Sequence, residues 1–426
     1  MNKTYRYLRA GIAVLVGTLS VLAFAGTFYR VKIFDIQFSA LLQRFFIDFS
    51  VAATVLLALL LLLTFIFGRI YCSTLCPFGL YQELLMLLFR RKNQSQKNYP
   101  YKYFLAALLF GTLIGGTAFL LRLIDPYTIF GSAASITCLG LSLAAAIAIL
   151  VWFKGRFFCT NICPIGTVLG LISKHALTRI SINADACVSC GLCASKCPTG
   201  SIDFKNKTVD NETCIKCFNC LAACRKNGIA VNRPAKAETE TPFSPSRRKL
   251  LLSGAVVAAF ALAAKGGIEL SKSIAKKIKK AILPAGAGNP EDFANRCLNC
   301  NLCVQNCPMK ILKKANEDYP AVHIDYSDSF CDYNCHKCSE VCPSGAIKRL
   351  TLPEKQKTQI ALAVIDESTC VKCGLCVMKC PRQAITKANG EFPHINTDEC
   401  IGCGACKNAC PVKAISISAL DRQRTL

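Results

Sequence analysis

The sequence predicts an α-helical membrane bundle, of four helices plus a fifth anchor or signal segment, joined to small cysteine-rich α+β domains. Three observations lead to this fold class. Four long stretches near the N-terminus contain no charged residue. The 426 residues include 29 cysteines, most of them at short and repeated spacings. The mean hydropathy of +0.36 is high for a soluble protein and indicates membrane segments.

The four apolar stretches are each about long enough to cross the hydrocarbon core as a helix, which takes roughly 20 residues. They cover residues 10–29, 49–68, 103–121 and 126–153. Buried helices of a large soluble domain are the alternative. Lysine and arginine gather before the first stretch, between the second and third, and after the fourth, with Arg69, Lys102 and Arg156 among them. The positive-inside rule therefore places the N-terminus, the middle loop and the chain after residue 153 on the cytoplasmic side.

An internal repeat follows the second and fourth stretches. GRIYCSTLCPFG at residues 68–79 matches GRFFCTNICPIG at residues 155–166, which indicates a duplicated two-helix unit. Each copy carries a C-x3-C-P motif, and the four cysteines are Cys72, Cys76, Cys159 and Cys163. If the halves pack with pseudo-symmetry, these cysteines form a candidate second redox or metal site. The alternative is a pair of structural Cys–Pro helix breaks beside a docking surface.

Six runs of four cysteines lie in the rest of the chain. Two precede residue 235: Cys187, Cys190, Cys193 and Cys197, then Cys214, Cys217, Cys220 and Cys224. Three more share their C-x2-C-x2-C-x3-C spacing: Cys297, Cys300, Cys303 and Cys307; Cys370, Cys373, Cys376 and Cys380; Cys400, Cys403, Cys406 and Cys410. A variant, with one extra residue in its first gap, contains Cys331, Cys335, Cys338 and Cys342.

This spacing is that of the bacterial ferredoxin run, so the sequence predicts six [4Fe–4S] clusters in ferredoxin-like α+β domains. Zinc ribbons use two separated C-x2-C pairs, and disulfides could not close across two-residue gaps six times over. In two-cluster ferredoxins the fourth cysteine of a run binds the neighbouring cluster. One cluster should therefore take Cys187, Cys190, Cys193 and Cys224, and the other Cys214, Cys217, Cys220 and Cys197. Whether the first C-terminal run pairs with the second or with the fourth stays open.

Residues around the cysteines suit this chemistry. Glycines inside the loops would let backbone N–H groups approach an anionic cluster; they are Gly191, Gly374, Gly402 and Gly404. Most runs reach a small residue and then isoleucine after the fourth cysteine, as in CPSGAI, and that isoleucine could shield the cluster from water.

The sequence does not indicate a haem within the membrane helices, a nucleotide cofactor or a nucleic-acid partner. All four histidines, His175, His323, His336 and His394, lie outside the four apolar stretches, so no bis-histidine haem is expected within the membrane helices. No phosphate-binding loop, dinucleotide fingerprint or nucleophile elbow is present, and no catalytic residue is assigned. The net charge of +25 comes without a basic stripe interleaved with aromatic residues, so nucleic acid is not an expected partner.

An export-like segment divides the chain. Ser246, Arg247 and Arg248 precede an apolar run, residues 250–264, that is short for a membrane span and suits the core of a signal. The expected domains are 1–179 (membrane helices), 180–234 (two clusters), 235–245 (linker), 246–288 (signal or anchor) and 289–426 (four clusters). Export of the last domain is the first interpretation, and an interfacial amphipathic segment with all clusters cytoplasmic is the second.

With these motifs, residues 1 to about 235 resemble the NapH type of membrane ferredoxin, and the chain from about residue 244 resembles the NapG and MauM type. The resemblance implies a twin-arginine (Tat) signal, although Leu250 occupies the position where such signals usually have Phe. It implies a fusion of two quinol dehydrogenase subunits in the bacterial inner membrane. Menaquinol or another quinol would be oxidised, and the electrons would pass to a periplasmic redox partner. The alternative function is maintenance or assembly of a partner's metal centre, for example by reduction of Cu(II).

Overall fold

The structure, a computed structural model, describes residues 2–24, 35–48, 50–89, 99–232, 247–278, 281–316 and 319–426. The chain divides into two compact units, Met1–Val21 with Ile33–Gly267, and Leu22–Lys32 with Ile268–Leu426. The boundary between Gly267 and Ile268 lies inside one helix, α13 (Arg247–Ile278). The expected linker at 235–245 and Ser246 of the expected signal lie outside the described residues.

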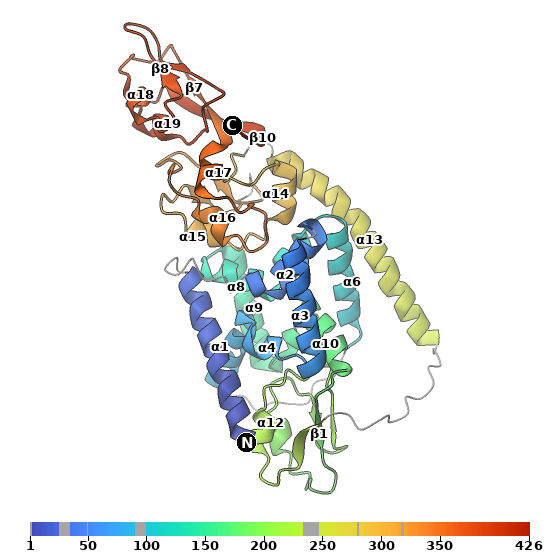
Figure 1. Ribbon diagram of the computed structural model, residues 1–426. Helices are drawn as coiled ribbons and strands as arrows, with labels where there is room; N and C mark the ends of the chain where they lie inside the picture. Colours follow the sequence, from blue (N-terminus) through green and yellow to red (C-terminus); the bar gives the residue numbers. More distant parts are fainter. Residues whose placement is uncertain are drawn as a thin grey trace. The chain divides into compact units, whose positions relative to one another are not determined.

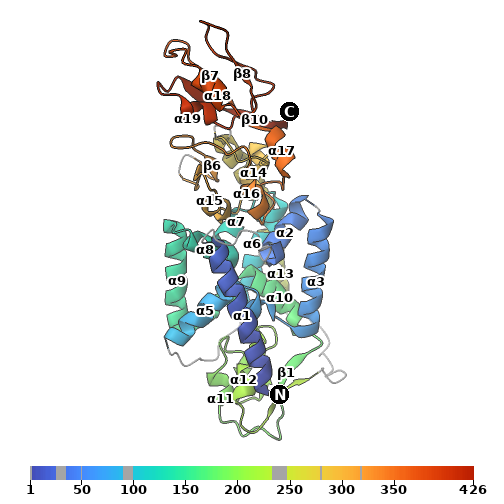
Figure 2. The ribbon, with the colours of Figure 1, turned by 60° about the vertical axis from the view of Figure 1, so that its left-hand side comes forward.

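Helices make up the N-terminal part of the first unit (Figures 1 and 2). In chain order they are α1 (Asn2–Phe24), α2 (Phe38–Asp48), α3 (Val51–Phe67), α4 (Tyr71–Thr74), α5 (Pro77–Leu88), α6 (Tyr101–Ile114), α7 (Phe119–Ile124), α8 (Pro126–Ala134), α9 (Cys138–Lys154), the π-helix η2 (Phe158–Ile162) and α10 (Pro164–Lys174). The repeat is visible in the helix ends, because α3 stops at Gly68 with φ 77° and α9 stops at Gly155 with φ 60°. Glycine adopts this left-handed backbone without the steric cost of a Cβ.

By length and apolar composition, Thr4–Phe24 is one described helix that could cross a bilayer. The α8–α9 pair would add a second span if the two act as one, and α3 and α6 are shorter apolar helices. The expectation of a single helix across residues 126–153 is wrong, because α8 and α9 meet at an angle of 119°. Ile136 sits at φ 53° in the turn, and the Thr137 hydroxyl accepts a hydrogen bond from the Gly140 N–H and so starts a new helix.

A small cysteine-rich domain lies at one end of these helices in both views. Its elements are β1 (Arg179–Ile182), α11 (Leu192–Ser195), β2 (Ile202–Asp203), β3 (Thr208–Val209), α12 (Asn219–Ala223) and β4 (Ile229–Asn232). Strand β1 pairs antiparallel with β4, from Arg179 opposite Asn232 to Ile182 opposite Ile229, and β2 pairs with β3. Isoleucines and cysteines share the core between the strands and the two short helices.

Helix α13 begins in the first unit and packs closely on α6 there. A Cβ added to Gly111 would lie 2.5 Å from the Phe260 carbonyl oxygen and 2.9 Å from the Ala263 Cβ. A Cβ added to Gly115 would lie 2.5 Å from the Ala264 carbonyl oxygen. The two glycines, four residues apart, let the helix backbones approach each other, as small residues do in membrane helix pairs.

The second unit contains four cysteine runs and short elements. They are α14 (Pro290–Arg296), α15 (Leu302–Gln305), β5 (Leu312–Lys313), β6 (His323–Ile324), α16 (Lys337–Val341), α17 (Leu352–Lys357), β7 (Thr358–Ile365), α18 (Leu375–Lys379), β8 (Ile385–Thr386), β9 (His394–Ile395), α19 (Ala405–Ala409) and β10 (Ile415–Thr425). Helix α15 contacts α16, and α18 contacts α19. The first and second runs therefore form one module and the third and fourth another, which answers the question that the sequence left open.

The last strand ties the two modules together. β10 pairs antiparallel with β7, from Ile415 opposite Ile365 to Thr425 opposite Thr358, with a bulge on the way. Near its end, the Gln423 side chain accepts from the N–H groups of Gly286 and Gly288 and donates to the carbonyls of Leu283 and Pro284. The segment 281–288 thus belongs to the core of the second unit.

Candidate iron–sulfur sites

Two cavities in the small domain are lined by four cysteines each. One is lined by Cys187, Cys190, Cys193 and Cys224, together with Ile182 and Ile229. The other is lined by Cys197, Cys214, Cys217 and Cys220, together with Ile180 and Ile202. This is the grouping expected when the fourth cysteine of each run crosses to the neighbouring cluster. The residues present therefore fit two [4Fe–4S] clusters, with thiolates around an apolar cavity.

The second unit repeats the crossed arrangement. Cys303 lies in electrostatic range of Cys297 and Cys300 from its own run and of Cys342 and Cys338 from the next. Cys338 has Cys331 and Cys335 from its own run as neighbours, and Cys307 from the first run. In the second module, Cys406 is beside Cys400 and Cys403, and Cys380 comes from the other run. Three of the four fourth cysteines, Cys307, Cys342 and Cys380, thus lie with cysteines of their partner run.

Left-handed backbone shapes the cysteine loops. In all five runs of regular spacing, the residues before and after the second cysteine have positive φ: Ser189 and Gly191, Lys216 and Phe218, Asn299 and Asn301, Lys372 and Gly374, Gly402 and Gly404. In all six runs the third residue after the fourth cysteine does too: Gly200, Asn227, Lys310, Gly345, Gln383 and Lys413. Only some of these are glycines, so the left-handed turn belongs to the loop shape and not to one residue type.

Backbone N–H groups point at the fourth cysteine of several runs. Gly228 N–H donates to Cys224 Sγ at 3.2 Å, and Ala414 N–H donates to Cys410 Sγ at 3.3 Å. Such bonds stabilise thiolate charge and raise a cluster's potential. The isoleucines expected to shield the clusters are buried in the five runs that have them at this place: Ile202, Ile229, Ile347, Ile385 and Ile415.

The two modules of the second unit meet at cysteine loops. The Cys331 N–H donates to the Cys403 carbonyl at 2.8 Å, and the Tyr326 hydroxyl donates to the Gly402 carbonyl at 2.6 Å. Cys331 and Cys403 belong to the second and fourth runs, so these two cluster sites are neighbours across the module boundary. This contact could not be predicted from the sequence, because it joins loops about 70 residues apart.

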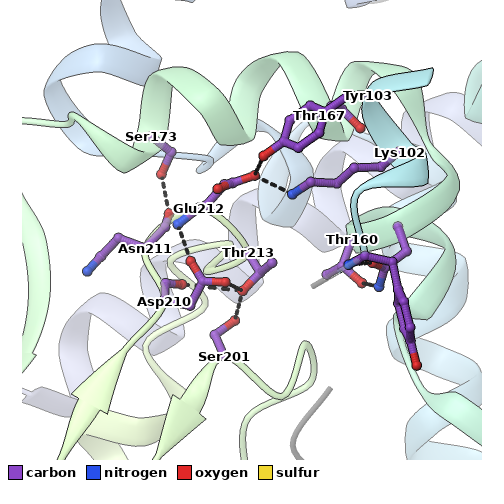
Figure 3. Close-up of polar contacts among 12 residues, drawn as sticks. Lys102, Tyr103, Thr160, Thr167, Ser173, Ser201, Asp210, Asn211, Glu212 and Thr213 are labelled. Carbon is purple, nitrogen blue, oxygen red and sulfur yellow. Dashed lines mark hydrogen bonds and ion pairs between the residues drawn. The ribbon is translucent and has the colours of Figure 1, made fainter. Parts of the chain in front are cut away.

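Glu212 fastens the small domain to helix α6 (Figure 3). Its carboxylate forms an ion pair with Lys102 and accepts a hydrogen bond from the Tyr103 hydroxyl at 2.7 Å. Both charged side chains are buried, with 2% of Lys102 and 8% of Glu212 exposed. Beside them, the Ser173 hydroxyl of α10 donates to the Asn211 carbonyl at 2.9 Å. The loop that leads to Cys214 is therefore held against the helices by buried polar contacts.

The cysteines of the two C-x3-C-P motifs come together in the first unit. All four are buried. Burial raises the pKa of Cys163 well above its usual range, and the neighbouring Cys159, Cys72 and Cys76 raise it further. The two copies share the same local packing around their cysteines. A Cβ on Gly79 would overlap the Cys72 carbonyl, and a Cβ on Gly166 would overlap the Cys159 carbonyl.

Arg69 and Arg156, which occupy the same place in the two repeats, reach across to the opposite copy. Arg69 Nη2 donates to the Cys159 carbonyl at 2.8 Å, and Arg156 Nη1 donates to the Cys72 carbonyl at 3.2 Å. Sequence reasoning counted both, with Lys102, as loop charges, but at 2% exposed or less all three are buried. Their identical position in GRIYC and GRFFC was the signal that could have singled out the two arginines.

Among the residues that the structure describes, no three His, Cys, Asp or Glu side chains converge as the ligands of a single metal ion would. In a [4Fe–4S] cluster each thiolate binds its own iron, so the four sulfur atoms surround the cluster instead.

Known protein families match most of the cysteine-bearing segments. Profiles described as 4Fe-4S dicluster domains match residues 179–225, 210–311, 296–346, 330–384 and 363–417. A profile described as a 4Fe-4S binding domain matches twice, at residues 49–94 and 137–183, and each match contains one C-x3-C-P motif. The double match agrees with the internal repeat.

Similarity to named proteins also indicates a ferredoxin-type chain. The methylamine utilization ferredoxin-type protein MauM of Methylorubrum extorquens is 32% identical over 33% of this chain and 69% of its own length. The chain belongs to this family of ferredoxin-type proteins. The ferredoxin-type protein NapG of Escherichia coli is also 32% identical, over 33% of this chain and 66% of its own. The methylamine utilization ferredoxin-type protein MauN of Paracoccus denitrificans is 32% identical over 37% of this chain and 59% of its own.

As a ferredoxin-type protein, the chain holds multiple [4Fe–4S] clusters and transfers electrons. Its cysteines must be thiolates to bind iron, yet burial raises the pKa of Cys217 to about 12 and that of Cys403 to about 11. These two buried thiols therefore favour the protonated form, and the binding of iron to them releases protons.

Serine substitutions test the crossed ligands of the ferredoxin-type small domain. Cys187→Ser and Cys224→Ser, in different runs, are expected to remove the same cluster, with a loss of about four iron atoms each. Cys197→Ser and Cys214→Ser should remove the other. Iron analysis and electron paramagnetic resonance (EPR) of the reduced protein would compare the signals that disappear. If Cys224→Ser instead abolishes the signal that Cys214→Ser abolishes, each run binds its own cluster and the crossing is wrong.

Proposed function

We propose that the chain is a membrane-bound electron-transfer protein that oxidises menaquinol or another quinol and passes the electrons to a periplasmic reductase. One observation carries the proposal. A two-cluster domain packs on the membrane-type helices within one compact unit, fastened by the buried Lys102–Glu212 pair. Quinol oxidation at the helices would thus occur next to electron acceptors.

The chemistry requires acceptors of single electrons. A quinol that becomes a quinone releases two electrons and two protons, and each [4Fe–4S] cluster, when bound, accepts one electron at a time. We assign the six clusters to the six cysteine runs, with ligands crossed within each pair. The protein's own contribution is to hold the thiolates, direct backbone N–H groups at them and cover them with isoleucine side chains.

We further propose that the chain is a fusion of a NapH-type and a NapG-type protein in a bacterial inner membrane. Similarity to both MauM and MauN, two separately named proteins, supports this. Helix α13, which begins at the Arg247–Arg248 pair, would be the former start of the second protein, with its twin-arginine signal kept as a fifth anchor. The four-cluster region would then lie in the periplasm, because the twin-arginine route carries folded domains.

A reduction assay tests the proposed function. Anaerobically purified, oxidised protein is mixed with a reduced menaquinol analogue, and the visible absorbance of the clusters is followed. Bleaching is expected in proportion to the electrons added, and the same assay with dithionite shows how much bleaching is possible. Bleaching by dithionite but not by the quinol would overturn the proposal. Loss of absorbance restored by Cu(II), without any response to quinol, would favour maintenance of a metal centre instead.

A further inference from the structure

The site formed by the two C-x3-C-P motifs has more positive charge than its carboxylates can neutralise. Arg69 is 1% exposed and forms hydrogen bonds to the carbonyls of Glu212 and Cys159, with the Cys72 sulfur 3.9 Å away. Among the described residues no carboxylate pairs with Arg69, and its Nε has no hydrogen-bond partner. Burial of an unpaired guanidinium is costly, so an anion should accompany it.

The second arginine of the repeat adds to the imbalance. Arg156 forms an ion pair with Glu83 at 3.1 Å, but the same carboxylate also pairs with Arg9 at 2.7 Å. Two guanidinium groups thus share one carboxylate, and no carboxylate in the described part of the chain pairs with Arg69. Asp125 also lies near Cys76, and its carboxylate accepts a hydrogen bond from the Thr128 N–H at the start of α8. Even with Asp125 included, three arginines face two carboxylates.

The anion that fits is built from the cysteines themselves. We propose that Cys72, Cys76, Cys159 and Cys163 together hold a seventh [4Fe–4S] cluster, with Arg69 as its buried counter-cation. Four thiolates around an oxidised [4Fe–4S] core carry a net charge of about −2, so the cluster would supply the negative charge that the buried arginines lack. This site goes beyond the proposed function, because none of the six runs contributes a ligand to it.

The cysteine sulfur atoms of this site accept hydrogen bonds from N–H groups, as those of the ferredoxin loops do. Gly166 N–H donates to Cys163 Sγ at 3.4 Å, as Gly228 N–H does to Cys224. The Gln82 side-chain amide lies 3.2 Å from Cys159 Sγ. The second cysteine of each motif precedes a proline, as the fourth cysteine does in five of the six runs.

Both arginines also contact the ferredoxin-type small domain beside one of its cluster sites. Arg69 Nη1 donates to the Glu212 carbonyl at 3.0 Å, two residues before Cys214. The Arg156 backbone N–H donates to the Pro198 carbonyl at 3.3 Å, directly after Cys197. Cys214 and Cys197 line the same cavity, so the proposed seventh cluster is next to that cluster site.

Wild-type protein provides the first test. Iron and acid-labile sulfide are measured per chain after anaerobic purification and reconstitution. Seven clusters predict about 28 iron atoms, whereas the six runs alone account for about 24. A count at the lower value, or about one zinc per chain in place of the extra iron, would overturn the proposal. Quinol plays no part in this measurement, so its result is independent of the proposed function.

Variants then locate the extra cluster. The Cys72→Ser/Cys159→Ser double variant is expected to lose about four iron atoms and to keep the EPR signals of the other clusters. The matched control is Cys138→Ser, since Cys138 is exposed at the start of α9 and outside both motifs. Equal iron content in the double variant and the control would sink the assignment. If the double variant does not accumulate, the wild-type count decides.

The proposed role of Arg69 as counter-cation is tested by measuring the midpoint potentials of the clusters. Arg69→Gln removes the positive charge and is expected to shift the midpoint potential of one cluster to a more negative value, because the reduced cluster carries more negative charge. Arg69→Lys keeps the charge and should restore most of the shift. A merely structural Arg69 would leave every potential unchanged in the folded variants, or would give the same shift with lysine as with glutamine.

Discussion

Gly402→Ala is expected to lose the cluster of the fourth C-terminal run, about four iron atoms per chain, and to lower the stability of the second unit by about 3 kcal/mol or more. Gly402 has φ 70°, but the backbone angle is not the main obstacle. Lys372, at the same place in the third run, carries a full side chain at φ 57°. At Gly402, an added Cβ would overlap the backbone carbonyl of Ala361 in strand β7. Backbone atoms paired with β10 cannot move aside, so the loop must leave its position.

Gly374→Ala is the matched control for this prediction. Gly374 also has a positive φ, 75°, but the nearest atom to an added Cβ is the Lys387 Cδ at 3.8 Å. The substitution should cost about 1 kcal/mol, the ordinary penalty for a Cβ in left-handed backbone, and keep the cluster. Iron analysis and thermal unfolding of both variants give the comparison. Equal losses in the two would show that backbone angle, and not the contact with Ala361, decides the outcome.

Lys102→Met is expected to destabilise the first unit by about 3–5 kcal/mol, because it leaves the Glu212 carboxylate buried without its cation. Glu212 keeps the Tyr103 hydroxyl as a donor, but a neutral hydroxyl cannot balance a buried negative charge. The small domain should then loosen from α6. Thermal unfolding in detergent and the rate of proteolysis at residues 180–232 would measure the effect.

The Lys102→Met/Glu212→Gln double variant is the control, since it removes both charges together. Its loss of stability should be smaller than that of Lys102→Met alone, as found when buried ion pairs are replaced by neutral residues. A cost below about 1 kcal/mol for Lys102→Met would contradict the prediction, because that is the range of solvent-exposed pairs.

Local spacing predicted the iron–sulfur regions because the ligands of a cluster loop lie close together in the chain. The crossed grouping of Cys187 with Cys224, and of Cys197 with Cys214, followed from the same spacing. The spacing did not predict the partner of the first C-terminal run, because only the packing of α15 on α16 selects it. A pairing that depends on long-range packing leaves no local pattern in a sequence.

The membrane region was harder to predict for two physical reasons. Hydropathy gives the length of an apolar stretch but not its straightness, and the turn at Ile136 contains no proline or glycine. Charge counting treats every lysine and arginine as exposed. Arg69 and Arg156 are instead buried, and each donates a hydrogen bond to a backbone carbonyl of the opposite repeat. Their positions depend on how the halves pack, which no single window of sequence contains.

The contacts of Gln423 bear on when the second unit can finish folding. Its side chain bonds Gly286 and Pro284, residues 137 and 139 positions earlier in the chain. During synthesis the loop at 283–288 is made long before Gln423, so the first module stays incompletely closed until residue 423 has left the ribosome. Closure of the unit would then come only after all four of its cysteine runs have been made, and a chain cut before Gln423 would lack the clamp entirely.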